Sequence, residues 1–267
     1  MKVIVSLTSI RSRLESLQLT VQSLLNQSLL PDEIHINLSK DPYLLDQGIL
    51  EIPKWLESYK TNQLIKVNWC ENIGPYRKLL PIIETFEEED IIVICDDDVL
   101  YHESWLSNLV AASSINPNKI ICTHARRITK NFLFTTSYIF WPITKVSGKK
   151  SNILPIGVGG ILYKKKFFNL DALYDVKYKD IAPTCDDFWF WMTACKVDQV
   201  HILSNTVSLF EVSNSESSLT KINYRKNKKY GIRRLIKVFV FIYGILGGSI
   251  INNDKVYKEI KKYFKDL

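Results

Sequence analysis

Short apolar runs alternate with helical repeats over the first 120 residues. β-branched and alternating runs predict strands at residues 2–7, 33–38, 64–69, 91–95 and 120–123. Apolar residues at helical spacing predict helices at residues 11–30, 43–60, 77–86 and 102–114, the second of them broken. The continuous run IIVIC at 91–95 is typical of a central parallel strand. This alternation predicts an α/β fold, a mostly parallel sheet with helices on both faces.

The pattern changes after residue 125. Residues 131–163 are rich in aromatic and β-branched side chains, and prolines and the GVGG at 157–160 interrupt them. They therefore predict irregular strands and loops. Farther on, a helix is expected over 187–196 and a last strand over 199–203.

Positive charge gathers at the end of the chain. The net charge is +7, yet residues 221–267 hold 13 Lys and Arg against 3 Asp and Glu, and the rest holds 22 against 25. The linker candidate SNSESS at 213–218 precedes this region. We therefore expect one domain over 1–220 and a basic tail over 221–267, with an anionic partner for the tail.

The tail has the pattern of an amphipathic helix. Apolar residues recur at helical spacing from Ile232 to Leu246, while Arg233, Arg234 and Lys237 share another face. Such a helix is typical of one that lies in an anionic membrane surface. A helix docked on its own body, or one that binds a partner chain, would show the same pattern. Nucleic-acid binding is disfavoured, because the body is acidic and no recognised module precedes the tail.

Composition excludes several classes of protein. With 46% hydrophobic and 24% charged residues the chain is neither disordered nor fibrous. No uncharged apolar run reaches the roughly 18–20 residues of a spanning helix. The N-terminus, MKVIVSLTS, has the pattern of a strand and not of a secretion signal, so a cytoplasmic location is expected. The five cysteines are scattered without a C-x-x-C, which predicts reduced thiols.

Three successive carboxylates, Asp96, Asp97 and Asp98, directly follow the apolar strand at 91–95. Ligands of open α/β sheets bind outside the carboxyl ends of strands. Three like charges so close together are costly without a cation, and Mg²⁺ or Mn²⁺ accepts carboxylate oxygens while leaving positions for phosphate. The alternative is an acidic turn that caps the next helix. The strand that leads into the cluster favours the metal site.

A second acidic pair, Asp186 and Asp187, opens the aromatic run FWFW at 188–191. Helix capping is the simpler role for Asp186. Four successive aromatic side chains cannot all face one core, so some are expected to line a pocket, where aromatic faces bind sugar rings. A carboxylate beside such walls has the surroundings that raise a pKa and suit a general base.

Seven segments, in this order, resemble bacterial glycosyltransferases of the GT-A (Rossmann-like) fold, in particular the family-2-like enzymes of surface-polysaccharide synthesis (capsule or lipopolysaccharide). The segments are VSLTSIRSR at 5–13, LLNQSLLPDEIHINLS at 24–39, NIGPYRKLLPIIE at 72–84, VICDDDVLYHESWLSNL at 93–109, THARRI at 123–128, PIGVGGILY at 155–163 and PTCDDFWFWM at 183–192. The resemblance implies a metal-dependent, hexosyltransferase-like enzyme. It would move a sugar from a nucleotide sugar to a hydroxyl of a glycan or lipid-linked acceptor, with inversion of the anomeric centre. The expected donor is a UDP-sugar.

The resemblance also implies roles for single residues. Asp96 and Asp98 would hold Mn²⁺ or Mg²⁺ on the donor diphosphate, and Asp187 would be the catalytic base. Contacts with the nucleotide sugar are implied for Ser6, Thr8, Arg11, Lys78, Asp96, Asp97, Gly159 and Gly160. Asp186 and Trp189 would contact the acceptor. For Arg13 an exposed helix position is favoured, whereas Arg126 and Arg127 are candidates for the diphosphate side.

Two other functions stay open. A haloacid-dehalogenase-type phosphohydrolase also uses D-x-D after an apolar strand, but its nucleophile follows the first strand, and here nearly a hundred residues come before. A non-catalytic sugar- or membrane-binding protein would not need two acidic motifs. For a glycosyltransferase with this tail, we expect a peripheral position at the inner face of the cell membrane.

Overall fold

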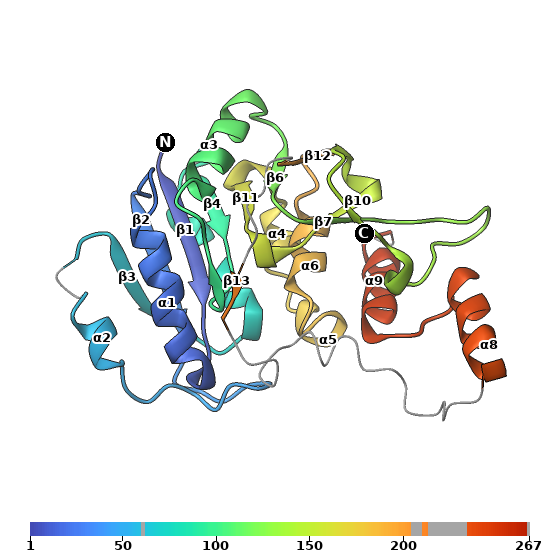
Figure 1. Ribbon diagram of the computed structural model, residues 1–267, viewed down its shortest axis with the longest axis horizontal. Coiled ribbons are helices and arrows are strands. Elements are labelled where there is room, and N and C mark those ends of the chain that lie inside the picture. Colours follow the sequence, from blue (N-terminus) through green and yellow to red (C-terminus); the bar gives the residue numbers. More distant parts are fainter. Residues whose placement is uncertain (60–61, 204–209, 213–233, 266–267) are drawn as a thin grey trace.

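The computed structural model describes residues 1–59, 62–203, 210–212 and 234–265. Within these residues an eight-stranded sheet runs through the molecule in the order β3-β2-β1-β4-β11-β6-β12-β9 (Figure 1). Its strands, in that order, are Ile65–Trp69, Glu33–Leu38, Val3–Thr8, Ile91–Ile94, Ile161–Lys164, Ile120–Cys122, Gln199–Ile202 and Gly148–Lys149. The first four run parallel, whereas β11 runs antiparallel to both of its neighbours. The predicted α/β class with a mostly parallel sheet is confirmed.

Helices cover both faces of this sheet, as predicted (Figure 1). Side chains of β4 alternate between two cores: Val93 packs with α1 and α3, and Ile92 packs with α6 and α9. The larger helices are α1 (Leu14–Leu25), α3 (Trp105–Ile115), α6 (Asp186–Thr193), α8 (Arg234–Ile245) and α9 (Asn252–Tyr263). Three single-turn helices are α2 (Lys54–Glu57), α4 (Leu170–Leu173) and α5 (Tyr178–Ile181).

Two small sheets complete the described chain. The strands β7 (Ala125–Arg127), β8 (Ile143–Thr144) and β10 (Ile153–Pro155) form one antiparallel sheet within the predicted irregular region. The second sheet pairs β5 (Val99–Leu100) with β13 (Phe210–Glu211), directly after the acidic cluster. The linker candidate at 213–218 and the basic cluster up to residue 233 lie outside the described residues, so the division of the chain at residue 220 stays a prediction.

Prolines account for the helix predictions that are wrong. Instead of a helix over 77–86, the structure has two short 3₁₀ helices, Gly74–Lys78 and Ile83–Thr85. Pro81 lies between them, where its missing N–H and its ring prevent a continuous α-helix. The predicted helical stretch over 43–60 is likewise reduced to α2, which begins directly after Pro53.

The last helix, α9, belongs to the core of the body. Val256, Tyr257 and Ile260 are buried against α6. The Asp254 carboxylate accepts hydrogen bonds from the Ser137 hydroxyl at 2.8 Å and the Tyr138 backbone N–H at 2.6 Å. Because α9 covers α6 on one side and the body covers it on the others, all four aromatic side chains of 188–191 are buried. The expectation that some of them line a pocket is wrong.

Candidate active site

A cavity of about 430 Å³ opens where β1 and β4 end. Thr8, the last residue of β1, and residues 96–98, which follow β4, line one wall, and the start of α6 lines another. This is the edge at which parallel sheets bind ligands. Most of the predicted site residues meet here: Thr8, Lys78, Asp96, Asp97, Asp98, Asp186 and Asp187.

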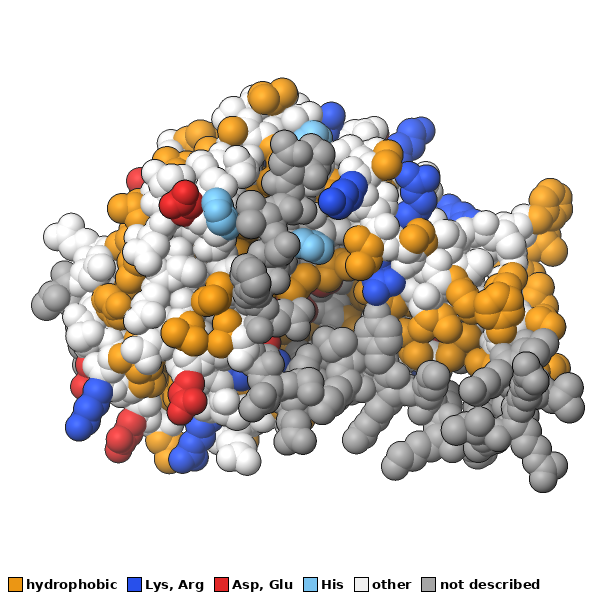
Figure 2. All heavy atoms as spheres, in the orientation of Figure 1, with side chains coloured by type: hydrophobic (Ala, Val, Ile, Leu, Met, Phe, Trp, Pro, Cys, Tyr) orange, Lys and Arg blue, Asp and Glu red, His pale blue; other side chains and the backbone are white. Residues whose placement is uncertain are grey.

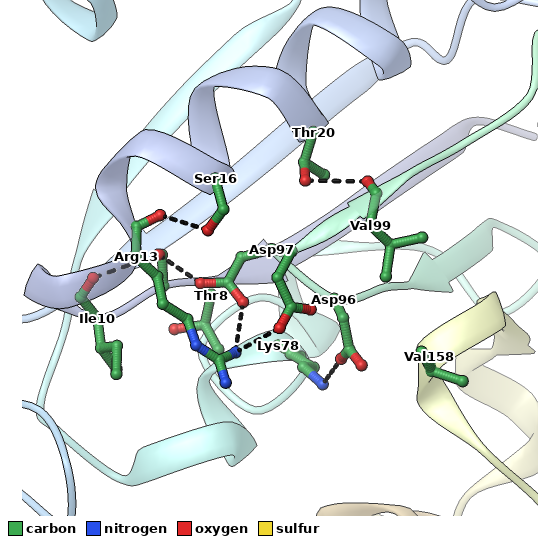
Figure 3. Close-up of polar contacts among 12 residues, drawn as sticks. Thr8, Ile10, Arg13, Ser16, Thr20, Lys78, Asp96, Asp97, Val99 and Val158 are labelled. Carbon is green, nitrogen blue, oxygen red and sulfur yellow. Dashed lines mark hydrogen bonds and ion pairs between the residues drawn. The ribbon is translucent and has the colours of Figure 1, made fainter. Parts of the chain in front are cut away.

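Lys78 connects the two acidic motifs. Its Nζ forms an ion pair with Asp96 Oδ1 and lies 3.7 Å from Asp186 Oδ2 (Figure 3 shows the first pair). The Ser6 hydroxyl fixes the Lys78 backbone by donating to its carbonyl oxygen at 2.6 Å. Burial lowers the pKa of Lys78, but Asp96 and the 186–187 pair outweigh it and raise that pKa well above its usual value. A permanent positive charge therefore stands between the acidic motifs.

Arg13 neutralises the other end of the acidic cluster. Its guanidinium lies 2.9 Å from Asp97 Oδ1 and 3.3 Å from Asp98 Oδ2 (Figure 3). The Ser9 hydroxyl donates to Asp97 Oδ2 at 2.5 Å. Burial raises the pKa of Asp97 to about 6, against the opposing effect of Arg13. The exposed position favoured for Arg13 is therefore wrong. Asp97 anchors Ser9 in the loop after β1, and its expected contact with the nucleotide sugar stays a prediction.

Asp187 presents a buried oxygen atom at the cavity. Its Oδ2 accepts a hydrogen bond from the Gly157 backbone N–H at 3.0 Å. Its Oδ1 is buried and has no hydrogen-bond partner among the described residues. Burial and the neighbouring Asp186 raise the pKa of Asp187 to about 8, and Lys78 opposes this shift. A carboxylate of this kind is suited to taking up a proton.

The glycines expected at the ligand stand instead against protein atoms. A Cβ on Gly159 would lie 1.8 Å from Thr123 Oγ1, and one on Gly160 would lie 2.5 Å from the Trp105 ring. Gly160 also has φ +90°, a conformation that favours glycine. Neither residue lines the cavity. Close packing of the chain between β10 and β11, and not contact with a ligand, accounts for both.

Three further expected contacts do not face the cavity. Ser6 is fully buried beneath it, and Arg11 is exposed outside it. Trp189 is fully buried, its Nε1–H donates to the Leu173 carbonyl at 3.1 Å, and its ring is stacked on Tyr263. Since the indole has no face open to a sugar, the structure corrects the expectation that Trp189 binds the acceptor.

A buried ion pair that sequence reasoning missed lines the same cavity. Asp46 Oδ2 lies 3.0 Å from the Arg77 guanidinium, and the two side chains are only 2% and 1% exposed. Arg77 also donates to the carbonyls of Ser9 and Gly74, each at 3.2 Å. Its other terminal nitrogen is buried without a hydrogen-bond partner among the described residues. Asp46 lay in a stretch interpreted as a broken helix, and its spacing gave no signal of this role.

The cavity is also lined by polar and aromatic groups in and around the β7-β8-β10 sheet. Arg126 lies with its guanidinium carbon 4.8 Å from the centre of the Tyr138 ring and donates to the Trp141 carbonyl at 2.6 Å. His124 lines the wall beside it, whereas Arg127 is exposed and does not. The cavity lining thus includes basic and aromatic groups besides the Asp46–Arg77 pair.

Two carboxylates of the acidic cluster are candidates for holding a divalent metal ion together with a bound ligand. Among the described residues no group of three or more His, Cys, Asp and Glu side chains could hold a metal alone. Asp96 and Asp98 nevertheless both face the cavity. Carboxylate oxygens are the donors that Mg²⁺ and Mn²⁺ prefer, and two protein ligands leave positions for diphosphate oxygens and water.

Solved structures of TarS from S. aureus share this fold. TarS 1-349 with UDP matches with a TM-score of 0.55 and 14% identity over 100% of this chain and 72% of that one. The TarS 1-349 complex with UDP-GlcNAc matches with a TM-score of 0.53 and 16% identity, over 99% of this chain and 73% of that one. A further TarS 1-349 structure matches with a TM-score of 0.50 and 17% identity over 79% of this chain. The match spans only 60% of that structure's length. The fold is therefore GT-A-like. No protein-family profile matches the chain, and no curated protein matches it in sequence.

Proposed function

We propose that this protein is a metal-dependent glycosyltransferase that moves a sugar from a UDP-sugar to a hydroxyl of a glycan or lipid-linked acceptor. One observation carries the proposal: a single cavity of a GT-A-like fold holds the 96–98 carboxylates, Lys78 and Asp187. The TarS structures with UDP and UDP-GlcNAc support a nucleotide-sugar donor.

The donor would lie along the wall that runs from the Asp46–Arg77 pair to Lys78. The buried Arg77 nitrogen that has no partner among the described residues would donate a hydrogen bond to the nucleoside end. The Thr8 hydroxyl, which donates to the Asn37 carbonyl at 2.7 Å, would accept one there. Lys78 and Arg13 supply positive charge where the diphosphate would lie. Asp96 and Asp98 would hold Mn²⁺ or Mg²⁺ there, and the bound ion would neutralise charge on the leaving diphosphate.

Asp187 would act as the base for the acceptor. It takes the proton of the acceptor hydroxyl while that oxygen attacks the anomeric carbon, and the bond from this carbon to the diphosphate breaks. UDP leaves with the bonding electrons, and attack from the face opposite the diphosphate inverts the anomeric centre. The acceptor would approach from the wall that carries Asp186, His124 and Tyr138.

The proposal is tested by incubating the protein with UDP-GlcNAc and Mn²⁺ and measuring released UDP. We expect saturable release that requires the metal, since slow transfer to water uses the same donor site. A haloacid-dehalogenase-type enzyme would instead hydrolyse simple phosphate esters such as p-nitrophenyl phosphate. Ester hydrolysis without UDP release from a panel of UDP-sugars would refute the proposed function.

Substituting Asp98→Ala should weaken the Mn²⁺ affinity of the UDP-loaded protein at least about tenfold, because a direct ligand contributes no less than a supporting group does. Fluorescence or calorimetric titration of Mn²⁺ in excess UDP measures this. Asp171→Ala, which removes an exposed carboxylate on α4, is the matched control and should bind like the parent. An unchanged Mn²⁺ affinity for Asp98→Ala would show that the metal, if bound, lies elsewhere.

A further inference from the structure

Large apolar side chains gather at the end of the molecule formed by α8 and the turn at 131–134. Phe132 is 100% exposed and Leu133 is 72% exposed. The space-filling view shows hydrophobic side chains together over this end of the molecule (Figure 2). We call this the apolar end surface, and its members are Phe132, Leu133, Phe134, Phe239, Phe241, Ile242, Tyr243 and Leu246.

Specific contacts join the two segments into one surface. The Asn131 side-chain amide donates to the Ile245 carbonyl at 2.6 Å, and its oxygen accepts from the backbone N–H groups of Leu133 and Phe134. These bonds hold the turn against the end of α8, with Phe132 fully exposed. On the other side of the turn, the Phe140 and Phe241 rings meet edge to face at 5.2 Å. The surface is therefore built by residues more than a hundred positions apart.

The exposed face of α8 carries apolar side chains, the reverse of the pattern expected for a helix in water. Gly244 is buried, and Val240 packs on the body's core. Phe239, Phe241, Ile242 and Tyr243 of the same helix are exposed, on a side where a soluble helix normally carries charged groups. Scattered exposed apolar residues are ordinary, but a contiguous group of large ones marks an interaction surface.

Basic groups border this surface. Lys130 is exposed next to the turn, and Lys258 donates to the Gly247 carbonyl and the Ser249 hydroxyl just after α8. Lys261 is a neighbour of Lys130. Burial lowers the pKa of Lys261, and the positive charge of Lys130 lowers it further. The sequence directly before α8, residues 221–233, lies outside the described residues and carries six Lys and Arg and no acidic residue. Apolar area edged by positive charge is complementary to anionic lipid headgroups above acyl chains.

We propose that the apolar end surface docks on an anionic phospholipid bilayer. The turn at 131–134 enters the acyl boundary, and α8 lies in the plane of the headgroups. Within the described part of the chain, no helix combines the length and apolar character needed to cross a bilayer. The inference goes beyond sugar transfer and does not depend on it, because none of these residues lines the cavity.

The test is co-sedimentation of the full chain with vesicles of phosphatidylcholine alone and of phosphatidylcholine with phosphatidylglycerol. We expect binding to the anionic vesicles that weakens as salt shortens the Debye length. The double variant Phe132→Ser/Leu133→Ser should lower the bound-to-free ratio at least about tenfold, since two apolar side chains no longer enter the bilayer. The matched control is Leu50→Ser/Ile115→Ser, which alters side chains exposed by 69% and 81% elsewhere and should bind like the parent.

Equal vesicle binding by the Phe132→Ser/Leu133→Ser variant and the parent would overturn the proposal. Sedimentation velocity without lipid tests the other occupant, a second copy of the chain. A parent dimer that this variant converts to monomer would assign the surface to self-association instead. Equal midpoints of thermal unfolding for parent and variant show that the variant keeps its fold. This control and the vesicle assay do not depend on whether the protein releases UDP.

Discussion

We expect Asp187→Asn to lower the rate of sugar transfer by about 10²- to 10⁴-fold, the range over which a positioned general base contributes, and to leave donor binding intact. Asparagine has nearly the same shape, and its side-chain oxygen still accepts the hydrogen bond that Asp187 accepts from the Gly157 N–H. It cannot take the proton of the acceptor hydroxyl. Initial rates of transfer, together with calorimetric titration of UDP-GlcNAc, measure the two effects separately.

The pH profile of the parent provides a second readout of the same residue. Asp187 accepts a proton only when it is ionised, and its pKa is raised to about 8. The rate of the parent should therefore rise with pH through about 8 and level off above it. The residual rate of Asp187→Asn should lack this limb. A near-parental rate in Asp187→Asn, with the limb retained, would assign the base to another group.

Asp46→Asn should lower the free energy of unfolding by about 3–5 kcal/mol, the cost of leaving one member of a buried ion pair without its counter-charge. The substitution keeps the size of the side chain but leaves the Arg77 guanidinium, 1% exposed, without a negative partner. Urea unfolding followed by circular dichroism measures the change. A loss of this size is a large fraction of the stability of an ordinary domain.

Asp41→Asn is the control for this prediction, because Asp41 is an exposed acid in the same loop. It should change the free energy of unfolding by less than about 0.5 kcal/mol. The double variant Asp46→Asn/Arg77→Met should regain part of the loss, since it removes the uncompensated charge. An Asp46→Asn protein as stable as the parent would mean that water enters the cavity and solvates Arg77.

The parts of this fold that sequence patterns predicted are those set by local physics. A β-branched run such as 91–95 forms a strand wherever both of its faces are buried, and the residues after it then lie at the ligand edge of the sheet. The cluster at 96–98 could therefore be placed without knowing its neighbours. Asp186 and Asp187 were placed by the aromatic run that follows them, and α6 does begin at Asp186 beside the cavity.

The parts that sequence patterns missed depend on contacts between distant segments. Arg13 and Asp97 are separated by 84 positions, and Asp46 and Arg77 by 31. Neither pairing leaves a periodic trace, since the loops that bring the side chains together have no repeat. The sequence misassigned Trp189 because the residues that cover it last, Tyr263 of α9 and Phe264, come from the far end of the chain.

The central claim is a metal-assisted nucleotide site in this cavity, and calorimetric titration of UDP into the parent protein tests it most directly. With Mn²⁺ present we expect saturable one-to-one binding that weakens when the metal is chelated and when Asp98 is replaced by alanine. The same UDP affinity with and without Mn²⁺ in both proteins, or no binding of UDP at all, would contradict the account.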